Sequence, residues 1–286
     1  VEELDPVFEN TCKAAGIEVI GKEVFTLLGE YTPTMIRKAV LGKDPEETLV
    51  QEKEVPARPP VLCAGCPHRA TFSVLHKLGL MVSGDIGCYT LGALAPLNAM
   101  DTTICMGASI SAAHGMNTVR GKDFAKKLVS VIGDSTFMHS GMTGLSDMVY
   151  NKSTGTVIIL DNSITGMTGH QDNPTTGKTI RGEETKQANL VTVCKGLGVE
   201  HVCVEDPFNL KAFEQIVREE TEREELSVII AQHPCALLKS VKAKPALAIG
   251  DKCKKCKKCM SIGCPAISAG KDGSVKIDPT QCNGCG

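Results

Sequence analysis

Short apolar runs alternate with segments of helical periodicity along the central part of the chain, from Val61 to about Cys235. The runs have the length of β-strands and recur at 81–86, 128–132, 156–160, 199–204 and 226–231. The segments with helical spacing lie between or beside them, at 69–79, 107–119, 142–152, 186–196 and 208–224. This alternation predicts an α/β domain with a doubly wound parallel sheet. The near-continuous apolar character of the runs fits strands that helices cover on both faces.

The two ends of the chain differ from this central pattern. Residues 1–58 are polar and mixed, with helical stretches near 7–15 and 33–41, and they close with the charged, proline-containing stretch KDPEETLVQEKEVPARPP. We interpret them as the end of a preceding domain and its linker. The other expected parts are a main domain, a short linker and a cysteine-rich segment, at 59–240, 241–250 and 251–286.

The cysteine-rich segment has the spacing of an iron–sulfur module. Its cysteines form C-x2-C-x2-C-x4-C-P followed by C-x-x-C, at Cys253, Cys256, Cys259, Cys264, Cys282 and Cys285. In two-cluster ferredoxins the fourth cysteine of such a run ligates the other cluster, although that run usually has three residues before it, where this chain has four. We therefore expect the first three cysteines to hold one [4Fe–4S] cluster and the last three to hold a second. The prediction is a partial two-cluster ferredoxin domain, with remaining ligands beyond Gly286; a zinc knuckle is the alternative.

Composition narrows the class of protein. The chain has 286 residues, 14 cysteines, 42% hydrophobic residues and a net charge of −2. It contains neither a membrane-length apolar run nor a signal-peptide pattern, and its near-neutral charge argues against a nucleic-acid partner. Cysteines in cluster spacing favour a reducing cytoplasm over a disulfide scaffold. The lysines around the first cluster motif, at 252, 254, 255, 257 and 258, form either a solvated face or a docking surface for an acidic electron carrier.

Polar residues follow two of the predicted strands directly. Gly133, Asp134 and Ser135 come after 128–132, and Asn162 comes after 156–160. Ligands of open α/β sheets bind beyond the carboxyl ends of the strands, where these residues are expected to meet. A carboxylate, an amide and a backbone carbonyl suit Mg²⁺, with diphosphate oxygens completing its coordination. Nearby glycines and the amino end of the predicted helix at 142–152 would favour the phosphates. Ordinary turn and N-cap roles are the alternative for both side chains.

A second group of cysteines lies at the ends of predicted elements in the main domain. Cys63 and Cys66 form a C-x-x-C, while Cys88 and Cys235 each follow a strand. At least the last two share the edge that carries Asp134, so these thiolates could converge on another [4Fe–4S] cluster. A redox dithiol, or simple packing of Cys88 and Cys235, are the alternatives. Cys105 is a rival ligand, and the cysteines expected to be merely packed are Cys12, Cys194 and Cys203.

Four further residues have possible catalytic or electrostatic roles. His68 and Arg69 follow the C-x-x-C and could meet a substrate carboxylate, tune the cluster or lie on the surface. His170 lies in a loop expected to face the cofactor, as does His139, and either is a possible acid–base group.

The stretch GDSTFMHSGMTGLSDMVYNKSTGTVIILDNSITGMTG resembles the signature of thiamine diphosphate enzymes. Ser135 and Asp161 depart from the usual GDG and NN residues, in a way typical of 2-oxoacid:ferredoxin oxidoreductases. DNSITGMTGHQDNPTTG is similar to the alpha subunits of the indolepyruvate ferredoxin oxidoreductase family, to their C-terminal portion. The resemblance implies Asp134, Asn162 and the backbone oxygen of Ile164 as metal ligands. It also implies a cluster held by the four main-domain cysteines, and cofactor contacts from Met106 and Gly107.

The resemblance also implies an activity. It is the oxidative decarboxylation of aryl 2-oxoacids such as indolepyruvate to acyl-coenzyme A, with reduction of ferredoxin. The implied cofactors are thiamine diphosphate, Mg²⁺ and [4Fe–4S] clusters; the implied partners are a beta subunit, ferredoxin, coenzyme A and the 2-oxoacid. The glutamate that activates thiamine is expected in a domain before Val1. Pyruvate or branched-chain oxidoreductases, a non-oxidative thiamine decarboxylase and a pure electron-transfer subunit are the alternatives.

Overall fold

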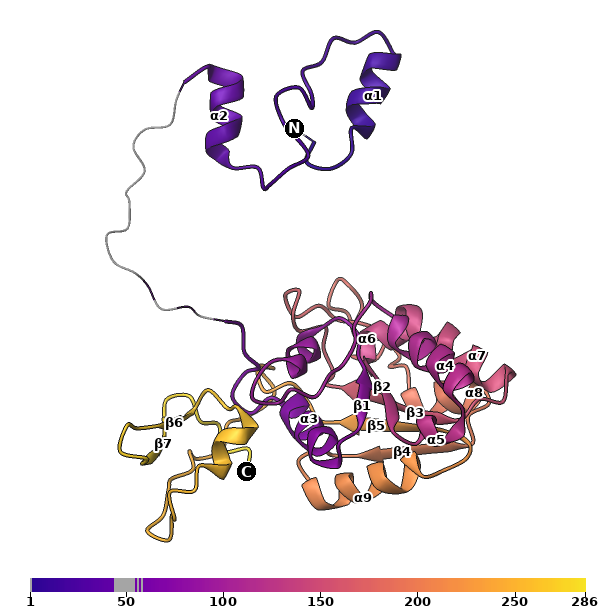
Figure 1. Ribbon diagram of the computed structural model, residues 1–286, viewed down its shortest axis with the longest axis vertical. Coiled ribbons are helices and arrows are strands. Elements are labelled where there is room, and N and C mark those ends of the chain that lie inside the picture. Colours follow the sequence, from indigo (N-terminus) through magenta and orange to yellow (C-terminus); the bar gives the residue numbers. More distant parts are fainter. Residues whose placement is uncertain (1, 44–54, 56, 58) are drawn as a thin grey trace. The chain divides into compact units, whose positions relative to one another are not determined.

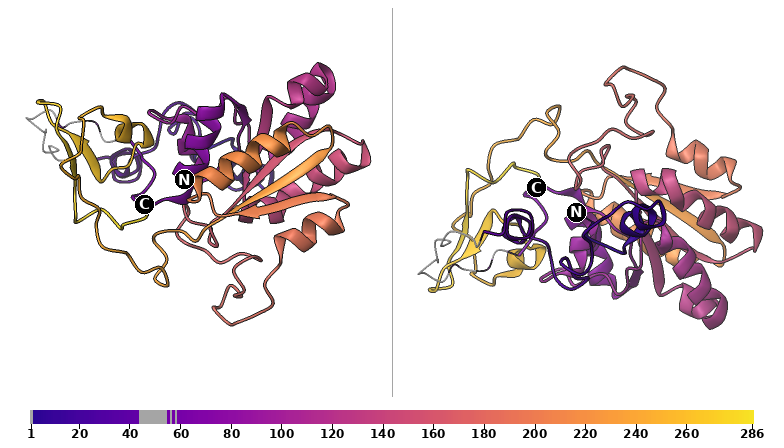
Figure 2. Two further views of the ribbon diagram at one scale, coloured as in Figure 1. Left: turned by 90° about the horizontal axis from the view of Figure 1, so that it is seen from below. Right: turned by 90° about the horizontal axis from the view of Figure 1, so that it is seen from above.

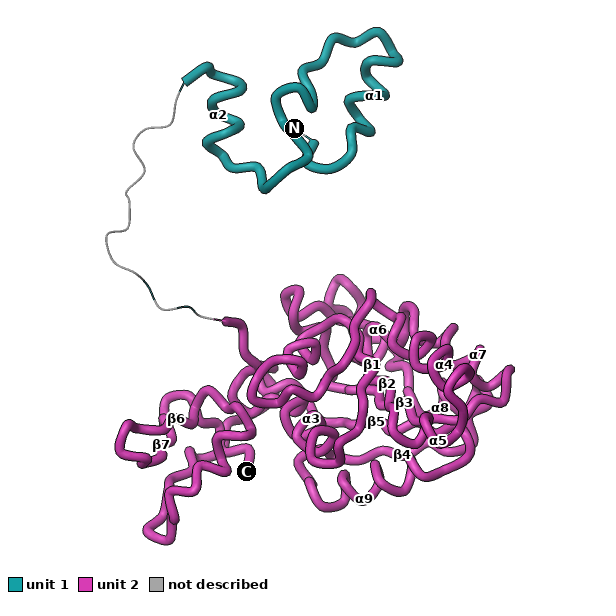
Figure 3. The backbone as a smooth tube through the Cα atoms, viewed as in Figure 1, with its two compact units in different colours: residues 1–58 teal, residues 59–286 magenta. Residues whose placement is uncertain are grey.

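The computed structural model describes residues 2–43, 55, 57 and 59–286. The chain divides into two compact units, residues 1–58 and 59–286 (Figure 3). In the first unit the described elements include helices α1 (Val7–Ala14) and α2 (Pro33–Leu41), which confirms the two helical stretches expected there. Neither helix contains a buried residue, and Phe25 is the buried apolar side chain among the unit's described residues.

The second unit is built on a five-stranded parallel sheet with the strand order β1-β2-β3-β5-β4 (Figure 1). Its strands are β1 (Met81–Ser83), β2 (Leu128–Gly133), β3 (Gly155–Asp161), β4 (His201–Glu205) and β5 (Leu226–Gln232). All five predicted strands are therefore confirmed. Each residue of β2 and β3 is buried, as expected of central strands that are covered on both sides.

Helices cover the two faces of the sheet, as the doubly wound prediction requires (Figures 1 and 2). One hydrophobic core lies between the sheet and helices α3 (Pro67–Leu78) and α9 (Leu210–Thr221). The other lies between the sheet and helices α4 (Ala108–Arg120), α7 (Met142–Tyr150) and α8 (Leu190–Gly196). Neighbouring strand residues alternate between them, because Ile158 belongs to the first core and Ile159 to the second.

The observed bounds differ from the predicted ones at three places with clear physical causes. The first strand ends at Ser83 and not at 86, because the backbone leaves the ladder where the buried Asp85 binds amides of another segment. The helix expected from 186 begins at Leu190, because the Asn189 side chain accepts a hydrogen bond from the Thr192 amide and caps it.

The third difference concerns the helix expected at 142–152. Helical structure begins at Asp134 and continues through α6 (Asp134–Thr136), the wide π-turn at Phe137–Gly141 and α7. The short α5 (Lys122–Ala125) precedes β2. The amino end of this helical run therefore lies at Asp134, directly after β2, and not at 142.

Residues 251–286 form turns, a 3₁₀ turn (Lys258–Ile262) and an antiparallel hairpin of β6 (Ile267–Ala269) and β7 (Val275–Ile277). A second 3₁₀ turn lies earlier, at Cys88–Ala93. The C-terminal segment belongs to the same compact unit as the sheet. Among the described helices, none is long and apolar enough to cross a membrane.

The core on the α4, α7 and α8 face provides a test of the packing. Leu145 of α7 is fully buried there. We expect Leu145→Ala to lower the free energy of unfolding by about 2–5 kcal/mol, because a cavity adds to the lost transfer free energy. Val119→Ala is the matched control, since Val119 lies in a helix of the same layer and is 83% exposed. It should change stability by no more than about 0.5 kcal/mol in a denaturant titration; equal losses for both variants would contradict this assignment of the core.

Candidate active site and cysteine groups

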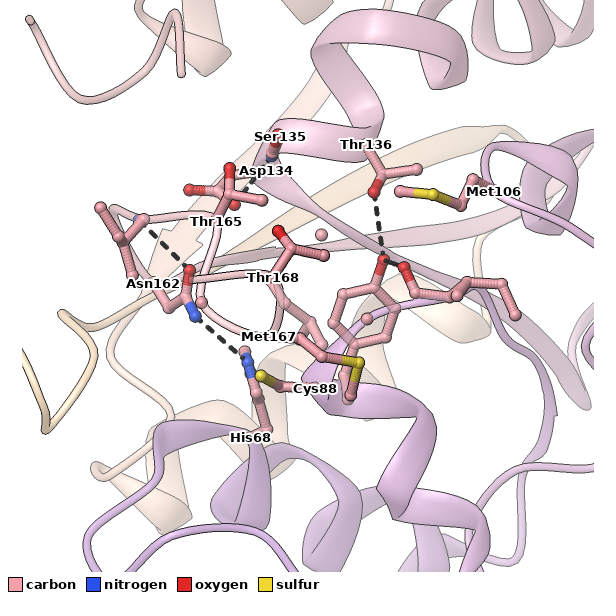
Figure 4. Close-up of a pocket in the computed structure, with 17 residues that line it drawn as sticks. His68, Cys88, Met106, Asp134, Ser135, Thr136, Asn162, Thr165, Met167 and Thr168 are labelled. Carbon is pink, nitrogen blue, oxygen red and sulfur yellow. Dashed lines mark hydrogen bonds between the residues drawn. The ribbon is translucent and has the colours of Figure 1, made fainter. Parts of the chain in front are cut away.

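A cavity opens at the carboxyl edge of the sheet, beside the ends of β1, β2 and β3 (Figure 4). It has a volume of about 120 Å³. Eight of the predicted site residues line it: His68, Cys88, Met106, Gly133, Asp134, Ser135, Asn162 and Ile164. In Figure 4, His68 and Cys88 lie at one side of the cavity, Asp134 and Ser135 at another, and Met106 apart from both pairs. The fold thus brings together residues that are separated by up to about a hundred positions in the sequence.

Asp134 is a buried carboxylate beside a second one. It is 3% exposed, and Asp161, 5% exposed, is the last residue of the neighbouring strand β3. Burial, and then the charge of Asp161, raise the pKa of Asp134 to about 7. The Ser135 amide donates to Asp134 Oδ1 at 2.8 Å, and the Thr175 hydroxyl donates to its Oδ2 at 3.3 Å. Among the described residues no lysine or arginine pairs with Asp134, so this edge has a surplus of buried negative charge.

Asn162 connects the same edge to helix α3. Its Nδ2 lies 3.4 Å from Nε2 of His68, and its Oδ1 accepts a bond from the Ile164 amide at 3.4 Å. Burial lowers the pKa of His68 to about 4, so this imidazole is neutral near pH 7. A neutral ring that accepts from Asn162 at Nε2 carries its proton on Nδ1. His68 is therefore suited to hold the amide, and it has no proton to donate from Nε2 in this arrangement.

Asp85 fixes the turn that presents Met106 to the cavity. The carboxylate is fully buried and accepts hydrogen bonds from the amides of Gly107, at 2.9 and 3.0 Å, and Ser109, at 3.1 Å. Gly107 has a left-handed φ of 89°, and a Cβ there would lie 2.2 Å from Ser140 Oγ. Glycine is therefore required at this position for both conformation and space. Met106 is half exposed and lines the cavity without being part of the core.

Tyr89 explains why residue 133 is glycine. A Cβ on Gly133 would lie 2.6 Å from the Tyr89 ring, which packs directly on the backbone at the end of β2. The Tyr89 hydroxyl donates to the Ile86 carbonyl at 2.9 Å, and its ring meets the His68 ring edge-on at 5.8 Å between centroids. Burial raises the pKa of this phenol above its ordinary value, so it stays protonated. The aromatic side chain forms an apolar wall of the cavity.

The four main-domain cysteines lie near one another. Burial, with a smaller effect of the thiols of Cys63 and Cys235, raises the pKa of the Cys66 thiol to about 12. Burial, and then Cys235 and Cys63, likewise raise the pKa of Cys88. The Cys235 amide donates to the Asn162 carbonyl at 2.9 Å, and a Cβ on Gly166 would lie 3.5 Å from Cys88 Sγ. This cysteine group therefore borders the cavity on the side of Asn162.

The C-terminal cysteines divide into two sets. Burial, and then the thiols of Cys264 and Cys282, raise the pKa of Cys285, so these three are neighbours. Cys253, Cys256 and Cys259, by contrast, are exposed. All fourteen cysteines are free thiols. Among the described residues, no three His, Cys, Asp or Glu side chains lie close enough together to hold a metal ion.

Some predicted site residues lie elsewhere. His170 is exposed and does not line the cavity, although the cavity includes Thr165–Thr168 of the same loop. The Thr165–Gln171 bridge closes this loop, and His170 stands at its tip with a φ of 62°. His139 is also exposed, and it bonds Ser140 at 2.8 Å. Cys105 is exposed and has no recorded interaction with the main-domain cysteines.

Sequence reasoning missed Asp85 and Tyr89. Both lie in the stretch GDIGCY after β1, where only Cys88 drew notice. The signal was present, because this Gly-Asp pair follows a strand just as Gly133-Asp134 does. The predicted strand extended to residue 86, so this Gly-Asp pair was assigned to the strand and not to the turn after it.

Comparisons with known proteins agree with this geometry. Residues 85–231 match the family model "Thiamine pyrophosphate enzyme, C-terminal TPP binding domain". The whole chain is similar to indolepyruvate oxidoreductase subunit IorA of Archaeoglobus fulgidus, at 38% identity over 316 residues and 49% of that protein. The same subunit of Pyrococcus abyssi is 37% identical over 325 residues, which cover 100% of this chain and 50% of the relative. The chain thus spans about half the length of the curated relatives it matches.

One solved structure supports the fold. It is the 2-oxoglutarate:ferredoxin oxidoreductase of Magnetococcus marinus, solved with 2-oxoglutarate, coenzyme A and succinyl-CoA bound. The TM-score is 0.53 at 19% identity, and the match covers 66% of this chain and 68% of the other. The matched family model includes Asp85, Tyr89, Asp134 and Asn162 and spans more than half of the sequence. The chain therefore belongs to the thiamine pyrophosphate enzymes, through their C-terminal TPP-binding domain.

Proposed function

We propose that this chain is the diphosphate-binding and electron-accepting part of an indolepyruvate:ferredoxin oxidoreductase. The observation that carries the proposal is the position of a cysteine group directly beside the cavity that contains Asp134 and Asn162. A thiamine enzyme that only decarboxylates has no use for such a group. The relatives' names, indolepyruvate oxidoreductase subunit IorA, support the substrate class.

The residues at the sheet edge fit a magnesium diphosphate. Two buried carboxylates without a basic partner are costly, and a divalent cation would neutralise them. Asp134, the Asn162 amide and the Ile164 carbonyl supply hard oxygen ligands of the kind that Mg²⁺ prefers. The amino end of the helical run, at Asp134, would face the anionic phosphates. When bound, thiamine diphosphate supplies the carbon nucleophile and the electron sink for decarboxylation.

The size of the cavity fits one part of such a cofactor. A volume of about 120 Å³ is below the roughly 300–1,000 Å³ of pockets that enclose a small ligand. A molecule as long as thiamine diphosphate would therefore extend past these walls. We propose that another domain covers the pyrimidine ring and carries the activating glutamate.

The cysteines fit the electron balance of an oxidative reaction. Loss of CO₂ from a 2-oxoacid and acylation of coenzyme A release two electrons and a proton. One-electron acceptors must take these two electrons one at a time. The final recipients would be two ferredoxins, or one ferredoxin that is reduced twice in succession. We propose that Cys63, Cys66, Cys88 and Cys235 hold a [4Fe–4S] cluster as the first acceptor. The C-terminal cysteines would form a ferredoxin-like domain that passes the electrons on. A cytoplasmic location and a beta subunit are part of the same proposal.

The cation site provides the first functional test. We expect Asp134→Asn to weaken Mg²⁺-dependent binding of thiamine diphosphate at least about tenfold, because it removes a charged ligand. In the unaltered protein the proton competes with the cation for a carboxyl whose pKa is about 7. Cofactor affinity should therefore fall about tenfold between about pH 8 and about pH 6, and Asp134→Asn should lose this dependence. Calorimetric titration measures both quantities.

Asp147→Asn is the matched control for this test, because Asp147 is exposed on the adjoining helix α7. It should bind the cofactor as the unaltered protein does. Unchanged affinity in Asp134→Asn would overturn the cation site.

The cysteine group beside the cavity provides the second test. In the complete complex, Cys63→Ser should lower the iron content and remove one low-temperature EPR signal. Decarboxylation of an arylpyruvate should continue, but the product should shift from acyl-coenzyme A to aldehyde, since no electron acceptor is near. Cys105→Ser, at an exposed thiol outside the group, is the control and should leave products unchanged. Full acyl-coenzyme A formation by Cys63→Ser would contradict the proposed electron route.

His68 provides a test by pH. Burial lowers its pKa from 6.5 to about 4, so between these values the unfolded chain binds more protons than the folded one. Stability due to this residue is therefore present above about pH 6.5 and is lost as the pH falls towards 4. The free energy of unfolding of the unaltered protein should therefore fall between pH 6.5 and pH 5. In His68→Gln this fall should be smaller by about 2 kcal/mol. His76→Gln, at an exposed position of the same helix, should not reduce it. Equal pH profiles for the two variants would show that His68 is not buried in its neutral form.

A further inference from the structure

Arg69 is buried between the two parts of the chain that carry cysteines. Its side chain is 5% exposed and extends from helix α3, three residues after Cys66. On one side Nε donates to the Cys63 carbonyl at 3.2 Å, and Nη2 donates to the Leu62 carbonyl. On the other side Nη1 donates to the carbonyls of Ile262, at 3.0 Å, and Gly263, at 2.5 Å. One guanidinium therefore joins segments that are about two hundred residues apart in the sequence.

No carboxylate pairs with this guanidinium among the described residues. The groups that interact electrostatically with it are thiols, and they come from both cysteine groups: Cys63, Cys66, Cys264 and Cys285. A buried cation without a counterion is costly. Arginine also cannot lose its proton in a protein. The residues around Arg69 thus supply a compensating charge only when the cysteines are negatively charged, as they are when they bind metal.

Other contacts keep the two segments together at the same place. Gly263 has a left-handed φ of 65°, and a Cβ there would lie 2.6 Å from Pro96 and 3.2 Å from Arg69 Nη1. Asn283 Nδ2 donates to the Ala64 carbonyl at 3.4 Å, and its side chain fills the space where a Cβ on Gly65 would stand. Both glycines permit close approach of the backbones. The interface is therefore built from the C-x-x-C loop and from residues next to Cys264, Cys282 and Cys285.

We propose that Arg69 is a positioning residue for electron transfer. It docks the C-terminal cysteine segment on the C-x-x-C loop and places a fixed positive charge between the two groups of thiols. The inference rests on the proposed function, because that function makes both groups cluster sites. Arg69 would set the gap that an electron crosses, and its charge would favour the reduced form of each cluster, because reduction adds negative charge.

Three variants of the complete protein separate docking from charge. Arg69→Gln removes the charge and the forked hydrogen bonds, whereas Arg69→Lys keeps the charge but cannot reach carbonyls on both sides with one planar group. Arg218→Gln is the control, because Arg218 is an exposed arginine of helix α9. Hydrogen exchange of the amides at 260–267 reports docking, and exchange in helix α8, which packs in the other core, serves as the internal reference. Redox titration followed by EPR reports the cluster potentials and the magnetic interaction between reduced clusters.

We expect exchange at 260–267 to be about tenfold faster in Arg69→Gln, as a loss of about 1.4 kcal/mol of docking free energy predicts. Exchange should also be faster in Arg69→Lys and unchanged in Arg218→Gln. The cluster potentials should fall in Arg69→Gln and stay near their normal values in Arg69→Lys, while the magnetic interaction should weaken in both. Unchanged exchange in Arg69→Gln, or unchanged potentials, would overturn the proposal.

The exchange measurement remains decisive if other parts of the scheme fail. In a protein that binds no iron, the proposed function would be wrong, yet exchange at 260–267 would still test the docking. If Arg69→Gln does not fold, Arg69→Lys and Asn283→Ala remain, and both must speed exchange at 260–267. Normal exchange in these two variants would contradict docking through this interface.

Discussion

The structure of the site depends on buried negative charge at the carboxyl edge of the sheet. Asp134 directly follows β2, and Asp161 is the last residue of the neighbouring strand β3. The parallel pairing of Gly133 with Leu160 brings the two carboxylates to the same edge, where both have little access to water. No basic side chain among the described residues reaches Asp134, so none of them neutralises the repulsion between the two carboxylates. A cation is the natural compensation. In the proposed function, the Asn162 amide and the carbonyl of Ile164 would be further ligands of this cation.

The same edge connects the cation site to the cysteines. Asn162 lies at the connection, since its amide meets His68 and its carbonyl receives the Cys235 amide. His68 in turn belongs to the helix that begins directly after Cys66. A movement of one group would therefore disturb the others through the contacts of Asn162 with His68, at 3.4 Å, and with Cys235, at 2.9 Å. In the proposed function this coupling fixes the distance between the site of decarboxylation and the first electron acceptor.

Arg69 extends the arrangement towards the C-terminal segment. Its guanidinium binds backbone carbonyls on both sides, and carbonyls do not neutralise a full charge. The sheet edge has excess negative charge, while the interface between the cysteine segments has an unpaired positive one. In the proposed function a divalent cation would neutralise the first excess charge, and anionic metal–thiolate clusters would neutralise the second.

Strand and helix positions followed from the sequence because hydrophobic periodicity is local and strong in 128–132, 156–160 and 226–231. The edge on which Asp134, Asn162 and Cys235 meet also followed, because parallel strands place their carboxyl ends together. The roles of Asp85, Tyr89 and Arg69 did not follow. Their partners are amides, a glycine and carbonyls between about twenty and two hundred residues away, and no local pattern specifies such contacts. The sequence by itself therefore determined the layers, the site edge and the kind of chemistry. Only the tertiary structure decided which buried charges face one another, because burial and distance are properties of the packed chain.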